Sequence, residues 1–456
     1  MLRPTIFREY DIRGVADADL TSDGVEQLGR GLGTYLIRHA GKSVNVGRDC
    51  RLSSTRLRDA LVDGLLAAGC DVTDIGVVPT PVLYYSAHYL NADGAVMITG
   101  SHNPPDYNGF KTVCGESTIH GEAIQRVRHS IETGDLETGP GTLRTADVSG
   151  PYVDEIVSGF HFTRPVKLVA DAGNGTAGPI FHRILEGLNV QATELYFEMD
   201  GHFPNHHPDP TQPENLEALR REVRERGAEL GIAFDGDSDR IGAVDEDGHP
   251  VYGDMLMLIY GREILSRKPG ATFIGEVKCS QTMYDELNRL GGRAIMYKTG
   301  HSLIKAKMKL ENAELAGEMS GHMFFADRYL GYDDALYAAC RLIEIVATSG
   351  KPLSAQTDGL PRAVCTPEIR VDCPDEVKFD VVARVAAALR DKHKVVDIDG
   401  VRVLFQHGWG LVRASNTQPV LVMRFEAAND TLLETYRGEM ESAVEEARRV
   451  VTSVAG

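Results

Sequence analysis

Short apolar runs alternate with longer amphipathic stretches through most of the chain. Residues 43–46, 71–75 and 95–98 are short and apolar enough for buried strands, whereas the apolar positions within 25–36 and 57–65 recur at the spacing of one helix face. Strands that alternate with helices of about 10 to 15 residues are typical of an α/β domain, and predict a mainly parallel sheet.

The same alternation then begins again twice. Residues 134–150 are rich in Gly, Thr and Asp and are expected to be a linker. After them, a strand at 167–170 and a helix at 215–226 belong to a second segment, and a helix at 253–266 with a strand at 272–277 opens a third. We expect each segment to form an α/β domain.

The pattern changes near Ala363. Short strands joined by tight turns and two helices replace the regular alternation, which favours a small α+β domain. The expected strands are 368–371, 394–397, 401–405 and 421–427, and the expected helices are 377–392 and 431–450. The predicted domain boundaries are 1–147, 148–249, 250–362 and 363–456.

Composition narrows the class of protein. The net charge is −18, from 48 basic and 66 acidic residues, which argues against binding nucleic acid or an anionic membrane. An anionic substrate would then need locally concentrated positive charge. The seven cysteines are scattered, without a C-x-x-C pair, and the chain has neither a signal core nor a long apolar span. These features predict a cytoplasmic protein.

A first candidate for chemistry is the loop Thr99-Gly-Ser-His-Asn-Pro-Pro105. It follows the apolar run 95–98, and Pro104 keeps Asn103 out of helical geometry. Ser101 is therefore presented at the carboxyl end of a strand, where open α/β sheets bind ligands. Taken alone, the loop is equally consistent with an ordinary turn.

The second candidate is Asp235-Gly-Asp-Ser-Asp-Arg240, which follows a strand expected at 230–234. Three carboxylates at alternate positions lie on one side of an extended segment, and such hard oxygen ligands suit Mg²⁺. Glu246 falls at position 12 of a calcium-binding EF-hand loop, but position 6 is Arg240 instead of glycine and the flanks read as strands. A solvated acidic turn is the other alternative, although its carboxylates would repel one another without a cation.

Two further polar loops follow expected strands. Gly317-Glu-Met-Ser-Gly-His322 offers Glu318 and Ser320 at a spacing suited to neighbouring sugar hydroxyls. Arg413-Ala-Ser-Asn-Thr-Gln-Pro419 combines a guanidinium, two hydroxyls and backbone N–H groups, which could hold a phosphate dianion or form only a polar turn.

Together the four loops resemble the α-D-phosphohexomutase superfamily. They read T-G-S-H-N-P, D-G-D-S-D-R, G-E-M-S-G-H and R-A-S-N-T-x-P, and with Tyr10-Asp-Ile-Arg-Gly14 they cover essentially the whole chain. The forms E-M-S-G-H and R-A-S-N-T resemble the phosphomannomutase/phosphoglucomutase branch. Phosphoglucosamine mutases, which usually read E-Q-S-G-H and R-P-S-G-T, are the alternative. Ser238 stands where glycine or phenylalanine is frequent, at a position that is not a ligand.

The resemblance implies three related mixed-sheet α/β domains plus a smaller α+β C-terminal domain around a central cleft. Ser101 would be a phosphoserine, and Asp235, Asp237 and Asp239 would hold Mg²⁺ against it. Such enzymes transfer this phosphoryl group to a hexose 1-phosphate, let the resulting 1,6-bisphosphate turn round, and take the other phosphate back. Glucose 1,6-bisphosphate would then be both intermediate and activator.

The resemblance also assigns the remaining site. Besides Ser101, the residues implied in catalysis are Arg13, Lys111, Arg240 and His322, and the residues implied in substrate binding are Tyr10, His102, Lys278, His301, Glu318, Ser320, Arg413, Ser415, Asn416 and Thr417. Proton transfer could fall to Lys111, His322, Arg13 or His301, and a lysine base would need neighbouring cations to lower its basicity. The arginines stay protonated and are expected to stabilise charge.

Glu318 and Ser320 are expected to contact the 3- and 4-hydroxyls of the sugar. Glucose and mannose differ only at C2, so both should be accepted. A metal-dependent phosphatase would release free phosphate instead, and a catalytically silent binding protein would lack Ser101 or an aspartate of the metal loop. The expected partners are small sugar phosphates, while protein partners and oligomeric state stay open.

Overall fold

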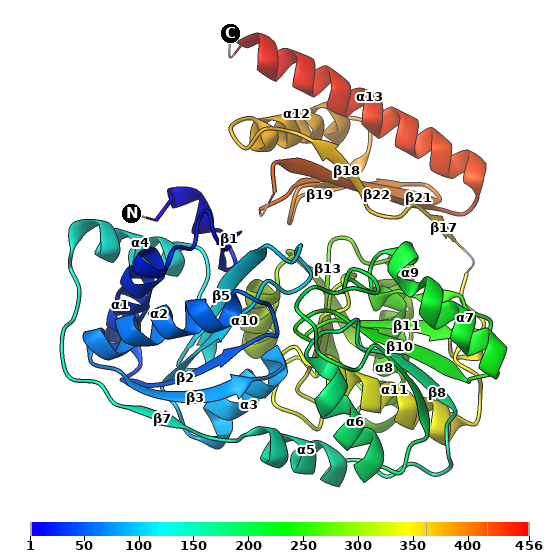
Figure 1. The fold of residues 1–456 in the computed structure, drawn as a ribbon. Helices are drawn as coiled ribbons and strands as arrows, with labels where there is room; N and C mark the ends of the chain where they lie inside the picture. Colours follow the sequence, from blue (N-terminus) through cyan, green and yellow to red (C-terminus); the bar gives the residue numbers. More distant parts are fainter. Residues whose placement is uncertain (1, 362, 417, 455–456) are drawn as a thin grey trace.

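The computed structural model describes residues 2–361, 363–416 and 418–454. In this part of the chain the strands form four separate sheets that follow one another along the sequence. Helices cover the first three, and the fourth stands at one end of the molecule with the C-terminal helix (Figure 1). We number these units domains 1 to 4. The expected architecture of three α/β domains and a smaller α+β domain is confirmed.

Domain 1 has a seven-stranded sheet in the order β1-β5-β4-β2-β3-β7, with β6 paired to β5. Its strands are β1 (Ile12–Val15), β2 (Ser43–Arg48), β3 (Asp71–Val77), β4 (Gly94–Ile98), β5 (Tyr107–Cys114), β6 (Ser117–Thr118) and β7 (Leu143–Thr145). A 3-10 turn η1 (Pro4–Ile6) precedes helices α1 (Ser22–His39), α2 (Ser54–Ala68), α3 (Thr80–Tyr89) and α4 (Glu122–Thr133).

Two segments of domain 1 differ from the sequence-based expectation. Residues 134–150 are not only a linker, because β7 pairs in parallel with β3 at the sheet edge. All three of its residues are exposed, so no apolar alternation marks the strand. The two prolines of Pro79-Thr80-Pro81 favour a turn by sequence alone, but this segment is the start of α3. Proline is tolerated there because the first helical N–H groups need no partner within the helix.

Domains 2 and 3 repeat the same plan with five and four strands, in the orders β12-β11-β10-β8-β9 and β14-β13-β15-β16. Domain 2 contains α5 (Ser149–Ser158), β8 (Leu168–Asp171), α6 (Ala177–Gly187), β9 (Ala192–Leu195), η2 (Pro213–Leu216), α7 (Glu217–Arg226), β10 (Leu230–Phe234), β11 (Ile241–Asp245) and β12 (Pro250–Val251). Domain 3 contains α8 (Gly253–Arg267), β13 (Thr272–Glu276), α9 (Gln281–Arg289), β14 (Arg293–Tyr297), α10 (His301–Glu311), β15 (Leu315–Gly317), β16 (Met323–Phe325), α11 (Ala335–Ser349) and η3 (Ser354–Thr357).

The three α/β sheets share one topological feature. Each has parallel strands followed by an antiparallel neighbour: β4 is parallel to β2 and antiparallel to β5, β10 is parallel to β8 and antiparallel to β11, and β15 is parallel to β13 and antiparallel to β16. The sheets are therefore mixed, where the alternating pattern alone predicts mainly parallel pairing. The turn between the last parallel strand and its antiparallel partner lies at an equivalent place in all three.

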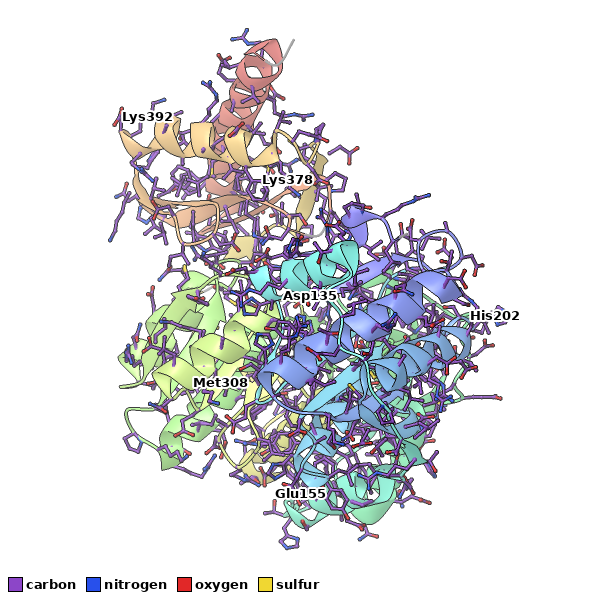
Figure 2. All side chains as sticks on the ribbon, turned by 90° about the vertical axis from the view of Figure 1, so that its left-hand side faces the viewer. Asp135, Glu155, His202, Met308, Lys378 and Lys392 are labelled. Atoms are coloured by element: carbon purple, nitrogen blue, oxygen red, sulfur yellow. The ribbon has the colours of Figure 1, made fainter. Side chains whose placement is uncertain are left out.

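Domain 4 is a six-stranded antiparallel sheet packed against two helices. It contains β17 (Val364–Cys365), β18 (Ile369–Asp372), α12 (Lys378–Arg390), β19 (Lys394–Val396), β20 (Val401–Phe405), β21 (Gly408–Ala414), β22 (Val420–Ala427) and α13 (Asp430–Val454). Figure 2 shows it standing above the rest, with Lys392 after α12. No helix in the described residues is both long and apolar enough to cross a membrane.

One apolar cluster extends across the first three domains, in addition to a separate core within domain 1. The largest buried cluster joins α3 of domain 1 to α5 and the sheet of domain 2 and to helices α8 and α11 of domain 3. At its centre, the buried Asp334 accepts hydrogen bonds from Tyr152 of domain 2 at 2.9 Å and from Tyr329 at 2.7 Å. Burial raises the pKa of Asp334 to about 6. This packing holds domains 1 to 3 together as one body.

Domain 4 docks on domain 3 through buried arginines. Arg402 of β20 is fully buried, and its guanidinium lies 3.7 Å from the centre of the Trp409 ring. Its Nη1 donates to the carbonyl oxygens of Val277, at 2.6 Å, and Cys279, at 2.8 Å, in the turn between β13 and α9. Arg424 of β22 donates to the same turn. These contacts fix the smaller domain over the turn between β13 and α9 of domain 3.

Replacing Arg402 with methionine would leave two buried carbonyl oxygens without donors. Each unsatisfied buried acceptor costs about 1–3 kcal/mol, so Arg402→Met should destabilise the protein by about 3 kcal/mol, seen calorimetrically as a lower thermal midpoint. Arg390→Met is the control, because Arg390 is an exposed arginine of domain 4 that pairs with the exposed Asp397. Its midpoint should barely change. Equal midpoints for the two variants would contradict the docking role.

Candidate active site

The four polar loops of the sequence come together from all four domains. Those of the α/β domains occupy the equivalent turns: β4 to β5 carries Ser101, β10 to β11 carries the three aspartates, and β15 to β16 carries Glu318 and His322. The second and third loops pair through a backbone bridge between Arg240 and His322. Carboxyl ends of strands therefore converge on one place, as open α/β sheets do where they bind ligands.

Ser101 lies at the centre of this convergence. It is 1% exposed, and its Oγ donates to Asp235 Oδ2 at 2.7 Å and lies 3.2 Å from His102 Nδ1. Its φ of 48° is in the left-handed region, which a non-glycine residue adopts at a cost in strain. Burial and the charges of Arg240 and Arg13 lower the pKa of His102 well below its ordinary value. His102 therefore faces the serine as a neutral imidazole.

The serine loop is held by an arginine that sequence reasoning missed. Arg51 is buried and donates through Nη2 to the carbonyl oxygens of Ser101, at 2.8 Å, and Asn103, at 2.6 Å. Asp49 accepts from Arg51 Nε at 3.2 Å and from the Gly100 N–H at 3.1 Å. The pair follows strand β2 directly, but contacts across some 50 residues leave no periodic signal in the sequence.

The three aspartates form a compact acidic site. Asp235, Asp237 and Asp239 are all 0% exposed, and ligand oxygens of the three lie within 4.8 Å of one another. Asp237 Oδ1 and Asp239 Oδ1 are buried without a hydrogen-bond partner among the described residues. Burial and the other two carboxylates raise the pKa of Asp235 well above its ordinary value. Orphaned hard oxygens in this arrangement fit a divalent cation.

The flanks of this site exclude an EF-hand. β10 and β11 pair as an antiparallel hairpin around the loop, where an EF-hand requires two helices. Position 236 of the same turn has no room for a side chain, because a Cβ there would lie 2.5 Å from the backbone oxygen of Ser101. The absence of a side chain at this position lets the serine loop and the aspartate loop approach each other.

Lys111 of β5 reaches into the acidic site. Its Nζ lies 2.7 Å from Asp237 Oδ2 and also contacts Asp239. Burial opposes its charge, but Asp237 and Asp239 outweigh burial and raise the pKa of Lys111 above its ordinary value. Surrounding cations would be needed to make it a base, and the structure surrounds it with carboxylates instead. Its environment favours a permanent positive charge over proton abstraction.

His322 belongs to a second buried cluster beside the first. Its Nε2 accepts from Arg240 Nε at 2.9 Å, and its Nδ1 lies 3.3 Å from Asp333 Oδ2. Lys305 of α10 donates to Asp333 Oδ1 at 3.0 Å, and His301 lies 3.7 Å from the same carboxylate. Burial, and then the charge of Lys305, lower the pKa of His301 well below its ordinary value. The sequence motifs include neither Asp333 nor Lys305, although two adjacent aspartates after Gly331-Tyr332 are an unusual feature.

The predicted sugar-binding residues line adjacent turns of domain 3. Glu318 is buried, and its Oε1 accepts from the Gly300 N–H at 2.7 Å. Ser320 is half-buried at the tip of the same loop. Lys278, after β13, lies 3.1 Å from Glu368 of domain 4 and lowers the pKa of that carboxyl to about 2. Carboxylate, hydroxyl and ammonium groups are thus brought to one side of the Ser101 site.

Domain 4 brings its loop to Tyr10 and to domain 3. Arg413 Nε donates to Asp399 at 3.0 Å, while its Nη2 is buried without a partner among the described residues. Asn416 donates to the Tyr10 hydroxyl at 2.5 Å, and Ser415 is buried beside it. A guanidinium end with an unused donor suits a phosphate. Thr417 lies outside the described residues.

Tyr10 and Arg13 enter the site from the N-terminal segment. Burial raises the pKa of Tyr10 to about 12. Arg13 donates to Asn103 in the serine loop at 3.0 Å and to Asp11 at 2.5 Å. Both residues therefore lie next to loops from other parts of the chain.

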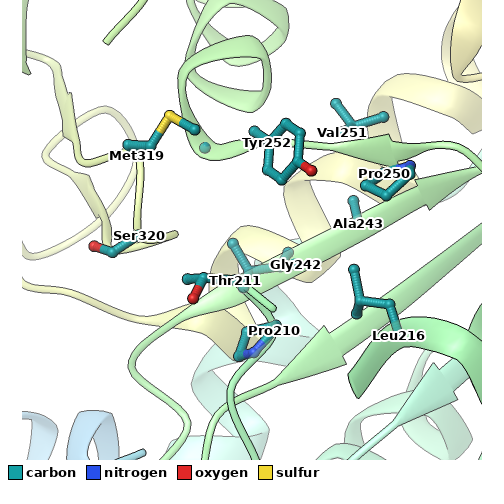
Figure 3. A pocket seen from close by; sticks show the side chains of 12 residues that line it. Pro210, Thr211, Leu216, Gly242, Ala243, Pro250, Val251, Tyr252, Met319 and Ser320 are labelled. Atoms are coloured by element: carbon teal, nitrogen blue, oxygen red, sulfur yellow. The ribbon is translucent and has the colours of Figure 1, made fainter. Parts of the chain in front are cut away.

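A small pocket lies beside the turn Met319-Ser320 (Figure 3). It is lined by residues of domain 2, by the start of α8 and by this turn, and none of its lining residues is charged. The residues are Pro210, Thr211, Leu216, Ile241, Gly242, Ala243, Pro250, Val251, Tyr252, Gly253, Met319 and Ser320. Without a cation it does not suit a phosphate, so the charged loops described above are the better substrate site.

The Lys305–Asp333 pair should be important for stability as well. Removing one partner of a buried ion pair typically costs about 3–5 kcal/mol, so Lys305→Met should lower the free energy of unfolding by about 3 kcal/mol in urea titrations. Lys309→Met on the same helix is the control, because Lys309 is exposed and pairs with the exposed Glu116. A Lys305→Met variant as stable as this control would show that Asp333 needs no buried cation.

Comparison with protein families gives a match in each of the four domains. The models described as phosphoglucomutase/phosphomannomutase alpha/beta/alpha domains I, II and III match residues 4–138, 150–248 and 252–364. The model described as the phosphoglucomutase/phosphomannomutase C-terminal domain matches residues 368–443.

Individual relatives are similar over nearly their whole length. A phosphomannomutase/phosphoglucomutase of Pseudomonas aeruginosa is 45% identical over 434 residues, covering 95% of this chain and 94% of the relative. A phosphoglucomutase of Neisseria gonorrhoeae is 42% identical over 445 residues, covering 96% of each. The crystal structure of a phosphoglucomutase/phosphomannomutase family protein from Burkholderia thailandensis matches with a TM-score of 0.92 and 44% identity, covering 98% of both chains.

Proposed function

Because the chain belongs to the phosphoglucomutase/phosphomannomutase family and is a hexose phosphate mutase, we propose that it interconverts hexose 1-phosphate and hexose 6-phosphate through a phosphoserine at Ser101. The observation that carries this assignment is the Ser101 hydroxyl, 2.7 Å from a carboxylate of the buried acidic site. In the first half of the reaction, the P–Oγ bond of phosphoserine breaks as a hydroxyl oxygen of the hexose phosphate bonds to phosphorus. The bisphosphate then turns round and returns its other phosphoryl group to Ser101.

We propose Mg²⁺ as the cation of the acidic site. Asp235, Asp237, Asp239 and an oxygen on Ser101 would hold it, and it would neutralise charge on the phosphoryl group during transfer. The buried and unpartnered Oδ1 atoms of Asp237 and Asp239 support this proposal. Lys111, which stays protonated among the same carboxylates, adds positive charge where the transferred group lies.

His322 is the residue we propose for proton transfer. Imidazole exchanges protons near neutral pH, whereas the arginines of the site keep their charge. Its Nε2 contacts Arg240, and its Nδ1 faces Asp333. In the first half, a proton taken from the attacking sugar hydroxyl would reside on His322 and pass to the Ser101 oxygen as it leaves phosphorus. In the second half, a proton taken from the attacking Ser101 hydroxyl would pass to the leaving sugar oxygen.

The rest of the site supports recognition of a sugar in two orientations. We propose that Glu318 and Ser320 bind the 3- and 4-hydroxyls, and that Arg413, Ser415, Asn416 and Thr417 hold the phosphate that does not react. Lys278, Tyr10, His102 and His301 complete the contacts in this proposal. Since none of these assignments reads the configuration at C2, both glucose and mannose phosphates should be substrates, with glucose 1,6-bisphosphate as activator.

We also propose that the protein acts in the cytoplasm, where sugar phosphates are the partners it needs. Its seven cysteines, all in the described residues, are free thiols, as expected in a reducing compartment. The net charge of −18 gives no support to binding nucleic acid or an anionic membrane.

The decisive experiment supplies glucose 1-phosphate or mannose 1-phosphate with Mg²⁺ and a trace of glucose 1,6-bisphosphate, and follows hexose 6-phosphate and free phosphate together. Hexose 6-phosphate should form from both sugars without free phosphate. Ser101→Ala should lower kcat by about a thousandfold or more, because the covalent intermediate cannot form.

Ser117→Ala is the matched control, since Ser117 is an exposed serine of the same domain and should leave turnover unchanged. Free phosphate as the main product would contradict the mutase in favour of a phosphatase. Turnover of glucosamine 6-phosphate alone would instead identify a phosphoglucosamine mutase.

The metal site predicts a separate binding result. Titration of the metal-free protein with Mg²⁺ in a calorimeter should show one site, and Asp239→Asn should weaken binding by at least about tenfold, since a charged ligand is lost. Asp247→Asn changes an exposed acid in the turn between β11 and β12, at the other end of β11, and should bind Mg²⁺ normally. Equal affinities for the two variants would rule out the aspartate loop as the metal site.

A further inference from the structure

Glu276 is a buried carboxylate that none of the assigned roles uses. It is the last residue of β13, the central strand of domain 3, and is 0% exposed. Burial raises the pKa of Glu276 above its ordinary value, while the nearby Lys278 opposes this effect. An ionisable group in this position is costly unless donors surround it. Its partners therefore indicate what it does.

Three separate turns donate to Glu276. Its Oε2 accepts from the Lys278 N–H at 2.9 Å and from the Thr299 hydroxyl at 2.8 Å. Its Oε1 accepts from the Met319 N–H at 3.2 Å. These donors lie in the turn that bears Lys278, the turn before His301, and the loop that bears Glu318 and Ser320. One carboxylate thus joins all the turns of domain 3 that carry the proposed sugar contacts.

Thr299 continues this linkage into the other domains. Its backbone N–H donates to Asp399 of domain 4 at 3.0 Å, and the same carboxylate oxygen accepts from Arg413 Nε at 3.0 Å. Its carbonyl oxygen accepts from the Tyr10 hydroxyl at 2.7 Å. That hydroxyl in turn receives the Asn416 amide at 2.5 Å. Both polar groups of the Thr299 backbone therefore contact a side chain that holds the phosphate loop.

The neighbouring glycine shows how closely these parts approach. Gly300 has a φ of 131°, and a Cβ there would lie 2.6 Å from the Tyr10 ring. Its N–H donates to Glu318 Oε1, the proposed contact for a sugar hydroxyl. The Thr299-Gly300 turn is therefore in contact with domain 1, domain 4 and the sugar loop at once.

The geometry points to Glu276 and Thr299 as positioning residues that couple the phosphate loop of domain 4 to the sugar-binding turns of domain 3. This inference rests on the proposed function of the two sites it connects. Neither residue is assigned a contact with the substrate. When a phosphate holds Arg413 and Asn416, their partners Asp399 and Tyr10 hold the Thr299 backbone in place. Glu276, which accepts from the Thr299 hydroxyl, then fixes the positions of Lys278 and of the loop that bears Glu318.

The Thr299 hydroxyl can be tested with nearly isosteric variants. Thr299→Val removes the donor to Glu276 and keeps the shape, whereas Thr299→Ser keeps the hydroxyl. A hydrogen bond to a buried charge is typically worth about tenfold or more in an equilibrium, so Thr299→Val should lower kcat/KM for hexose 1-phosphate about tenfold. The loss should appear mainly in KM, because these bonds exist before the transition state. Thr299→Ser should restore most of it.

Glu276→Gln is the second variant. An amide has one acceptor oxygen, so its NH₂ group must face one of the three donors, and the loss in kcat/KM should exceed that of Thr299→Val. Thermal midpoints are measured for every variant. A role limited to folding would lower the amount of active enzyme, and hence kcat, while leaving KM at its wild-type value.

A double-mutant cycle then tests the coupling itself. Asp399→Asn weakens the contact with Arg413 and with the Thr299 backbone, without touching the Thr299 hydroxyl. If the residues act through one linkage, the loss in the double variant should fall short of the product of the single losses by at least about threefold. Multiplicative losses, or a Thr299→Val variant with wild-type KM, would overturn the inference. Absence of turnover by the wild-type enzyme would instead contradict the proposed function.

Discussion

The site is built around three carboxylates that are buried from water and repel one another. Asp235, Asp237 and Asp239 occupy one turn with no exposed surface, an arrangement that is unfavourable unless positive charge surrounds it. Domain 1 supplies Lys111, and Arg240 of the same loop lies 4.0 Å from Asp235 Oδ2. The negative charge of this turn is thus neutralised by positive groups from more than one domain, and a divalent cation would neutralise the remainder.

The same strand topology in domains 1 to 3 brings these groups together. In each α/β domain the functional loop joins the last parallel strand to its antiparallel partner, so three equivalent turns face the same point with different side chains. Domain 1 presents Ser101, domain 2 the acidic turn, and domain 3 the groups that we propose for sugar recognition and proton transfer. The shared apolar core of these domains keeps the turns in register. Substrate chemistry is therefore divided among similar folds by loop composition alone.

Domain 4 is attached differently. Among the described residues, only a small apolar cluster joins Val277 of domain 3 to Trp409 and Leu411 of domain 4. Most of the other contacts are hydrogen bonds, such as those from Arg402 to the Val277 and Cys279 carbonyl oxygens and from the Thr299 N–H to Asp399, whereas a large apolar cluster extends across domains 1 to 3. A hydrogen bond of this kind is lost when either partner is replaced, and breaking it exposes little apolar surface. The loop of domain 4 that we propose for phosphate binding is thus placed largely by a small set of directional bonds, and the same bonds reach the turns that we propose for sugar binding.

Local patterns determined much of this protein. Periodic apolar positions predicted β10 and α8 nearly residue for residue. The loop motifs identified the family and marked Ser101 and the three aspartates as candidates, because strand-end loops and acidic spacing are encoded by neighbouring residues. Elements without such a signal were missed, as with the fully exposed β7 and the helix that starts at Thr80.

Only the tertiary structure decided the electrostatics and the supporting residues. Lys111 contacts carboxylates that lie more than 120 residues away, and these raise its pKa, whereas a lysine base would need neighbouring cations to lower it. Arg51, Asp333 and Glu276 act on groups brought close by folding, and no spacing in the sequence marks them. The sequence alone therefore determined which side chains are available at strand ends, while the charge and hydrogen bonding of each depend on distances between segments that only the packing of four domains sets.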